Sequence, residues 1–133
     1  MRAIPYLYFA GACIEALRFY RDAIGADIRA LVRFGDMPGA PADRKDKIMH
    51  AELGLGDSTI FASDGQTTGS SGGYAICLQA ADDAEAERLF AALAAEGKVS
   101  VSLMTTPFAS RFGMTTDKYG TPWIVTTPQA ASE

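Results

Sequence analysis

The spacing of apolar residues changes from a strand pattern to a helix pattern near the beginning of the chain. Residues 3–9, AIPYLYF, are mainly aromatic or apolar and predict a strand, which Pro5 places at a sheet edge or at the start of the strand. After Ala12 the apolar residues recur every three or four positions, which predicts a helix with one buried face. The residues of that face are Cys13, Leu17, Tyr20 and Ile24. Gly25 supplies the left-handed residue that commonly ends a helix.

Three further strands are predicted to complete the first half of the chain. The first covers residues 27–34 and is followed by a loop, residues 35–46, that is rich in glycine, proline and charge. The other two cover residues 48–55 and 58–63, and the Gly-Asp pair between them is typical of a tight hairpin. The order of elements in this half is therefore strand, helix and three strands.

A segment of small polar residues separates the two halves. Residues 66–73, QTTGSSGG, cannot pack a core and are predicted to be a linker. The chain is therefore predicted to be a single domain, residues 1–133, built from two related modules over residues 1–65 and 74–130.

The second half repeats the order of elements of the first. A strand over residues 74–78 precedes a helix, which Asp82 is expected to cap with Glu85 three residues later. Gly97 is expected to end that helix. The remaining strands are predicted over residues 99–104 and 121–126, with a loop that contains Pro107 between them.

Composition and charge exclude several classes of protein. The chain has 133 residues, 48% of them hydrophobic and 21% charged, which is typical of one globular domain. A formal net charge of -4, without a dense run of Lys and Arg, argues against a nucleic acid partner. Apolar runs are too short for a membrane span, so we expect a cytoplasmic protein without a membrane partner. Cys13 and Cys77 belong to no C-x-x-C pair and are expected to be buried free thiols.

Six short motifs resemble those of the PhnB-like branch of the glyoxalase/bleomycin-resistance/dioxygenase superfamily. They stand in the family's order and cover nearly the whole chain. The motifs are residues 5–11 (PYLYFAG), 16–20 (ALRFY), 34–38 (FGDMP), 50–53 (HAEL), 112–114 (FGM) and 116–123 (TDKYGTPW). The resemblance implies the vicinal-oxygen-chelate fold, an α+β fold in which two βαβββ modules form curved mixed sheets around a cavity. It also implies a homodimer.

The resemblance further implies where a metal would bind. Metal-dependent members of the superfamily hold a divalent ion with His and Glu side chains from the first and last strands of each module, and such a site needs several ligands together. None of the candidate inward-facing residues is His, Asp or Glu. These residues are Ile4, Tyr6, Tyr8, Thr59, Ile60, Phe61, Tyr74, Ile76, Trp123 and Val125. No cofactor is therefore predicted, and a divalent metal is the less favoured alternative.

His50 and Glu52 are the candidate catalytic residues. His50 is the only histidine, and it shares a strand face with Glu52 because alternate residues of a strand point the same way. An imidazole oriented by a carboxylate can act as an acid or base near neutral pH. The same two residues are also expected either to be a polar pair in a binding cavity or to have a structural role, and the sequence leaves these alternatives open.

An aromatic cavity is the candidate binding site for a small-molecule ligand. Such a lining suits planar or amphipathic molecules, although aromatic residues also fill ordinary cores, which is the favoured alternative for Trp123. The candidate lining residues are Tyr6, Tyr8, Phe61, Tyr74 and Trp123. Arg111, expected in the loop before the last strand, could contact an anionic ligand group or simply be solvated.

Three functional hypotheses follow. The leading one is a metal-independent small-molecule binding protein of the PhnB-like type. The second is an enzyme, a lyase, isomerase or dioxygenase acting on a small oxygenated substrate, with His50 and Glu52 as acid/base groups or as metal ligands. The third is an antibiotic-sequestering dimer. A methyltransferase is disfavoured, because the glycine-containing segment 52–57 precedes a strand and not the helix that a nucleotide site requires.

Overall fold

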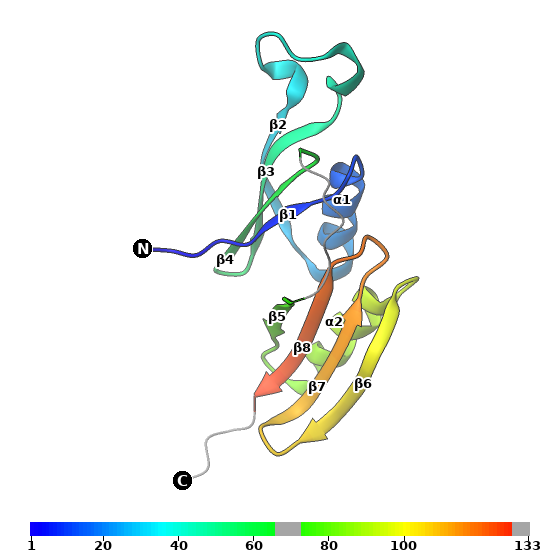
Figure 1. Cartoon of the computed structure of the whole chain (residues 1–133). Coiled ribbons are helices and arrows are strands. Elements are labelled where there is room, and N and C mark those ends of the chain that lie inside the picture. Colours follow the sequence, from blue (N-terminus) through cyan, green and yellow to red (C-terminus); the bar gives the residue numbers. More distant parts are fainter. Residues whose placement is uncertain (66–72, 129–133) are drawn as a thin grey trace. The chain divides into compact units, whose positions relative to one another are not determined.

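The computed structural model describes residues 1–65 and 73–128 of the chain. They fall in two compact units, Met1–Ser70 and Ser71–Glu133, and each unit has a four-stranded mixed sheet and one longer helix (Figure 1). The predicted α+β fold of two βαβββ modules is confirmed, and neither sheet closes on itself. A cavity enclosed by curved sheets stays a prediction. Residues 66–72, most of the predicted linker, lie outside the described residues.

The first unit has the strand order β1-β4-β3-β2, in which β1 and β4 are parallel and the other pairs are antiparallel. Its elements are β1 (Tyr6–Tyr8), α1 (Cys13–Ile24), β2 (Asp27–Arg33), β3 (Ile48–Leu55) and β4 (Ser58–Ser63). Two short 3-10 helices, η1 (Phe34–Asp36) and η2 (Ala42–Arg44), lie in the connection between β2 and β3. The parallel pairing places the N-terminal strand beside the last strand of the unit.

The core of the first unit lies between α1 and one face of the sheet. The predicted helix face is correct, and Gly25 ends α1 in the left-handed conformation with φ 72°. The buried residues of the helix are Cys13, Ala16, Leu17 and Tyr20, and those of the sheet include Leu7, Ala51, Leu53, Ile60 and Ala62. Because successive strand residues point to opposite faces, the alternate residues of the same strands form the other face of the sheet.

The second unit repeats this arrangement with the strand order β5-β8-β7-β6 (Figure 1). Its elements are β5 (Ile76–Gln79), α2 (Asp83–Ala94), β6 (Lys98–Thr106), β7 (Ala109–Thr116) and β8 (Pro122–Pro128). Asp82 caps α2 by accepting a hydrogen bond from the backbone N–H of Glu85, whose carboxylate accepts one from the N–H of Ala81, as the sequence predicted.

The prediction of a loop between residues 104 and 121 was wrong, because Ala109–Thr116 forms β7, one of the two inner strands of the sheet. The residues of β7 on the helix side are small or polar, such as Gly113, whose Cα faces Phe90 of α2. The apolar residues Phe112 and Met114 point to the other face, since they alternate with Gly113. In β7 the apolar residues are therefore not the buried ones, and the sequence pattern did not indicate a strand.

Gly97 does not end α2, which stops at Ala94 with Ala95 as its C-cap. The left-handed residue after the helix is Glu96, with φ 58°. Gly97 is required for a different reason, because a Cβ at this position would overlap the backbone oxygen of Thr116 at the end of β7. Within the described residues, neither helix is long and apolar enough to cross a membrane.

Candidate functional site

The face of the first sheet that points away from α1 carries a cluster of rings. The register pairs Tyr6 with Phe61 and Phe61 with Glu52, so these side chains form one row across β1, β4 and β3. The Tyr6 and Tyr8 rings are stacked with centroids 5.2 Å apart, and Phe61 meets Tyr6 edge-on at 5.8 Å. Tyr6 is 40% exposed and Tyr8 is 52% exposed. We call the cluster of Tyr6, Tyr8, His50 and Phe61 the aromatic face.

His50 joins this cluster from β3 on the same face. Its ring meets that of Phe61 edge-on at a centroid distance of 4.8 Å. Its Nδ1 atom lies 2.8 Å from the hydroxyl oxygen of Tyr6, a hydrogen-bond distance that spans the intervening strand β4. Burial, followed by the nearby Tyr8 and Cys13, raises the pKa of Tyr6, so its hydroxyl keeps its proton at neutral pH.

Glu52 shares the face with His50, as the strand alternation predicts, but it does not orient the imidazole. The hydrogen-bond partner of His50 is Tyr6, and among the described residues no hydrogen bond or ion pair to the Glu52 side chain is found. The half-buried carboxylate is therefore a charged neighbour of the aromatic face, with its oxygens free to meet a ligand or water.

Asp64, which the sequence analysis missed, fixes the strands that carry the aromatic face. Its side chain is 2% exposed, and Oδ1 accepts hydrogen bonds from the backbone N–H groups of Gly11 at 2.8 Å and Cys13 at 2.9 Å. Oδ2 accepts a third, at 2.9 Å, from the N–H of Ile48 at the start of β3. One carboxylate thus ties the end of β4, the beginning of α1 and the beginning of β3.

The start of α1 contained a sequence signal for the contact between Asp64 and the helix. The N-cap residue is Ala12, whose side chain cannot accept a hydrogen bond, so a helix predicted from residue 13 needs an acceptor from elsewhere. Asp64 supplies it and also places a negative charge at the positive end of the helix. Burial, and then the charge of Asp64, raise the pKa of Cys13 to about 12.

Trp123, a candidate lining residue, lies in the core of the second unit. It is 1% exposed, and its Nε1 donates a hydrogen bond of 2.7 Å to Oδ2 of Asp117. Its strand neighbour Val125 pairs with Gly113, which faces α2, so both residues of β8 point to the helix side. Trp123 has no accessible ring face to offer a ligand here. Tyr74 precedes β5 and is 51% exposed in the second unit.

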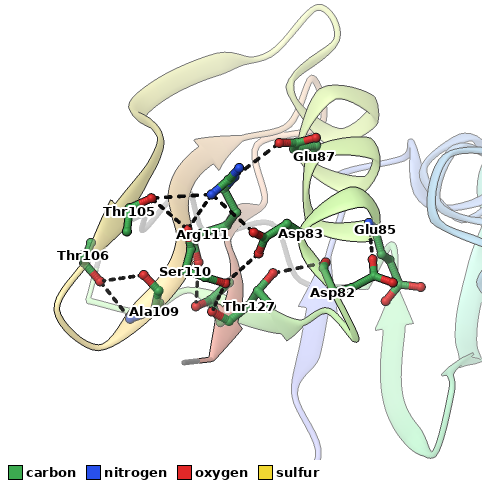
Figure 2. Close-up of polar contacts among 11 residues, drawn as sticks. Asp82, Asp83, Glu85, Glu87, Thr105, Thr106, Ala109, Ser110, Arg111 and Thr127 are labelled. Carbon is green, nitrogen blue, oxygen red and sulfur yellow. Dashed lines mark hydrogen bonds and ion pairs between the residues drawn. The ribbon is translucent and has the colours of Figure 1, made fainter. Parts of the chain in front are cut away.

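Arg111 lies in β7 and not in a loop, and its guanidinium is occupied by two carboxylates of α2. Nη1 is 3.4 Å from Asp83, and Nε donates to Glu87 at 3.2 Å (Figure 2). Ser110 donates a 2.6 Å hydrogen bond to the same Asp83 side chain. Figure 2 shows these contacts joining α2 to the sheet. The charge of Arg111 is therefore paired within the protein and is not free for an anionic ligand.

The second sheet also has a face that points away from its helix, and the sequence analysis assigned its residues to the wrong side. Trp123 and Val125 were expected to point into a cavity, but they point toward α2. The residues that alternate with them form the free face. These residues include Phe112 and Met114 of β7, Ile124 of β8 and Cys77 of β5. The prediction of two buried thiols is therefore correct for Cys13 and wrong for Cys77, which is exposed. Their side of the sheet follows from the register of β8 with Gly113 of β7, which no local pattern in the sequence reports.

The residues at the superfamily's metal positions do not fit a divalent ion. On the free faces, the first and last strands carry Tyr6, Tyr8, Thr59 and Phe61 in one unit, and Cys77, Gln79, Ile124 and Thr126 in the other. Apart from the Cys77 thiol, these are phenols, hydroxyls, one amide and hydrocarbon side chains, which are poor ligands for such metals, and one thiol cannot hold an ion by itself. In the part of the chain that the structure describes, no group of three or more His, Cys, Asp or Glu side chains is placed to share an ion.

Comparison with known proteins was made on sequence and on structure. A family model described as 3-demethylubiquinone-9 3-methyltransferase matches residues 1–126. Protein YjdN of Escherichia coli is 34% identical over 134 residues, which cover 91% of each chain. The solved structure of protein PA1353 from Pseudomonas aeruginosa is 43% identical, with a TM-score of 0.88, over 98% of this chain and 99% of its own.

Two more distant structures share the fold. The PhnB protein of Bacillus cereus, described as a 3-demethylubiquinone-9 3-methyltransferase, is 22% identical with a TM-score of 0.81, over 96% of this chain and 99% of its own. The fosfomycin resistance protein FosX of Mesorhizobium loti is 12% identical with a TM-score of 0.63, over 97% of this chain and 92% of its own.

Proposed function

The chain belongs to the PhnB-like family described as 3-demethylubiquinone-9 3-methyltransferase, within the vicinal-oxygen-chelate superfamily, and from this premise we propose that it binds a planar small molecule without a metal. The observation that carries the proposal is the partly exposed aromatic face of Tyr6, Tyr8, His50 and Phe61. Rings in this arrangement present both flat surfaces and edges to a ligand ring. Binding sites for small molecules commonly combine such surfaces with a few polar groups.

The activity in the family's description is not part of the proposal. The glycine-containing segment after Glu52 is a hairpin, in which β3 ends at Leu55, Gly56 has φ 59° and β4 begins at Ser58. A site for a nucleotide-like methyl donor of the glycine-rich type would need a helix to begin there. The hairpin therefore argues against a methyl-donor site of this type at this segment.

Metal independence is supported by the side chains at the metal positions, described above, which offer only Cys77 as a strong ligand. Protein treated with a chelator is expected to bind a planar probe such as 2-naphthol as well as untreated protein does. Loss of binding on chelation that zinc, nickel or manganese restores would contradict the proposal.

The binding experiment is an NMR titration of uniformly 15N-labelled protein with 2-naphthol. Shift changes are expected at the amides of β1, β3 and β4 that carry the aromatic face. Tyr8→Ala is expected to weaken binding about threefold to tenfold, the contribution of one aromatic pair. Tyr119→Ala is the control, because it removes an aromatic ring of the second unit that lies in the turn between β7 and β8. Equal weakening by both substitutions would contradict a site on the aromatic face.

Catalysis by His50 is a second candidate, and the contact with Tyr6 is the observation that favours it. A phenol at 2.8 Å from Nδ1 holds an imidazole in one orientation, as a catalytic acid or base requires. Glu52 on the same face could act on a second proton of a small oxygenated substrate. Any lyase, isomerase or dioxygenase turnover of the wild-type protein should then be lost in His50→Ala, and unchanged turnover would remove this candidate.

We also propose that the chain forms a homodimer, the state that the antibiotic-sequestering alternative requires. Exposed apolar side chains of the second unit support an interface, since such groups mark association sites when they are contiguous. They include Met104, which is opposite Phe112 on the free face of the second sheet, and Phe108, whose ring meets that of Phe112 edge-on at 5.3 Å. Light scattering after size-exclusion chromatography is expected to give twice the chain mass of 14.1 kDa, and a monomer at micromolar concentration would contradict this.

A further inference from the structure

The contact between Tyr6 and His50 has a preferred direction. In a neutral imidazole one nitrogen donates and the other accepts. A phenol hydroxyl is a strong donor and a weak acceptor, whereas the unprotonated imidazole nitrogen is a good acceptor. The O–H of Tyr6 therefore donates to Nδ1 of His50 at 2.8 Å, which leaves the imidazole proton on Nε2.

The other ring nitrogen of His50 is available to a ligand. Among the described residues, Nε2 has no hydrogen-bond partner. Every buried side-chain nitrogen or oxygen of those residues has a hydrogen-bond partner. Because Nε2 has none, it is not buried and is in contact with solvent. An N–H donor that reaches solvent beside exposed rings is the combination that fixes the orientation of a bound planar molecule.

We propose that Tyr6 is a positioning residue that holds His50 in the Nε2–H form, and that this N–H selects planar ligands bearing an uncharged acceptor oxygen, such as a carbonyl. The selection by His50 rests on the proposed binding function. The role of Tyr6 concerns the protein without ligand and can be tested by itself.

The charges around His50 favour an uncharged acceptor. Glu52 lies two residues along the same strand face, so a ligand carboxylate near His50 would meet a like charge. On the neighbouring strand β2, Val32 is opposite His50. Arg29 lies over Gly54, further along the face, where it is paired with Asp27 at 3.6 Å. From β1 and β4 the groups near the imidazole are the uncharged Tyr6 and Phe61.

The role of Tyr6 can be measured directly, because His50 is the only histidine in the chain. Long-range 1H–15N correlation at about pH 8.5, where an ordinary histidine is neutral, reports which nitrogen carries the proton. The wild-type protein is expected to show the Nε2–H form alone, and Tyr6→Phe the mixture of both forms found in a solvated imidazole. Tyr8→Phe, which also loses a phenol hydroxyl but none that contacts His50, is expected to match the wild type. A proton on Nδ1 in the wild type, or no change in Tyr6→Phe, would overturn the assignment.

The donor role of His50 is tested with acetophenone and ethylbenzene, which have similar shapes and differ in the carbonyl oxygen. His50→Phe keeps an aromatic ring and removes the N–H. It is expected to weaken acetophenone binding about fivefold, the net effect of one ordinary hydrogen bond, and to change ethylbenzene binding less than about twofold. An equal change for both probes would overturn the donor role. If neither probe shifts the amides of the aromatic face in the wild type, the proposed binding function fails, while the tautomer measurement still decides the role of Tyr6.

Discussion

Replacement of Asp64 tests whether one buried carboxylate holds the framework of the candidate site. Asp64→Ala removes the acceptor of three backbone N–H groups, those of Gly11, Cys13 and Ile48. Asp64→Asn keeps the shape but places an amide NH2 against one of these donors, since an amide has a single acceptor oxygen. The expected order of stability is therefore wild type, then Asp64→Asn, then Asp64→Ala.

The expected loss in the free energy of unfolding follows from how deeply the three N–H donors are buried. Cys13 and Ile48 are fully buried, so their N–H groups would find neither water nor a new partner in Asp64→Ala, whereas Gly11 is only partly buried. Each buried N–H left without a partner costs about 1–3 kcal/mol, which gives roughly 2–6 kcal/mol for the two. Relief from burying a carboxylate offsets part of this, so we expect a loss of about 3 kcal/mol for Asp64→Ala and about half of that for Asp64→Asn.

Urea unfolding followed by circular dichroism measures the loss, and amide hydrogen exchange locates it. Exchange is expected to accelerate at both Cys13 and Ile48 in Asp64→Ala, and in Asp64→Asn only where the amide NH2 replaces the accepting oxygen. Asp46→Asn is the matched control, since it removes the same charge from an exposed side chain and should change stability by less than about 0.5 kcal/mol. If Asp64→Ala unfolds at the same urea concentration as Asp46→Asn, the anchoring role of Asp64 is wrong.

Three further predictions concern thiols, pH and a close backbone approach. Iodoacetamide is expected to modify the exposed Cys77 in the native protein and Cys13 only after unfolding, and peptide mass mapping that finds native Cys13 modified as fast would contradict this. Folding raises the pKa of Cys13 from 9.0 to about 12, so the unfolded chain loses this proton first and stability should fall as pH rises between those values. Urea unfolding should show a shallower fall in Cys13→Ala, and an identical pH dependence would refute the cause. Gly97→Ala is expected to destabilise by about 1–3 kcal/mol, because the added Cβ overlaps the Thr116 backbone, and an unchanged melting temperature would show that the chain relaxes there.

Local patterns were sufficient for much of the fold. The strands β3 and β4 have the predicted bounds, because an alternating pattern on each side of a Gly-Asp turn fixes both the strands and their register. The helix α1 ends at the predicted glycine for a local reason as well, since a residue without a side chain adopts the left-handed conformation at no steric cost. The strand β7 was missed because its buried residues are small or polar.

The members of the aromatic face were candidates from the sequence, but their arrangement depends on pairing between distant segments. Tyr6 and His50 meet only because β1 pairs in parallel with β4 and β4 with β3. The sequence analysis considered Glu52 as the partner of His50 because it could compare only neighbours on one strand. Contacts across a sheet are set by strand order, which no local spacing reports.

The sequence by itself determined the order of elements in the first module, the repeat of strand and helix at the start of the second, and the residue types at the metal positions. Each of these depends on local periodicity or on the identity of the residue at one position. Only the tertiary structure decided which face of a strand is covered by a helix and which residues meet across it. Trp123 shows the difference. Its place in a strand follows from its neighbours, but its burial against Asp117 follows from the side of the sheet on which α2 packs.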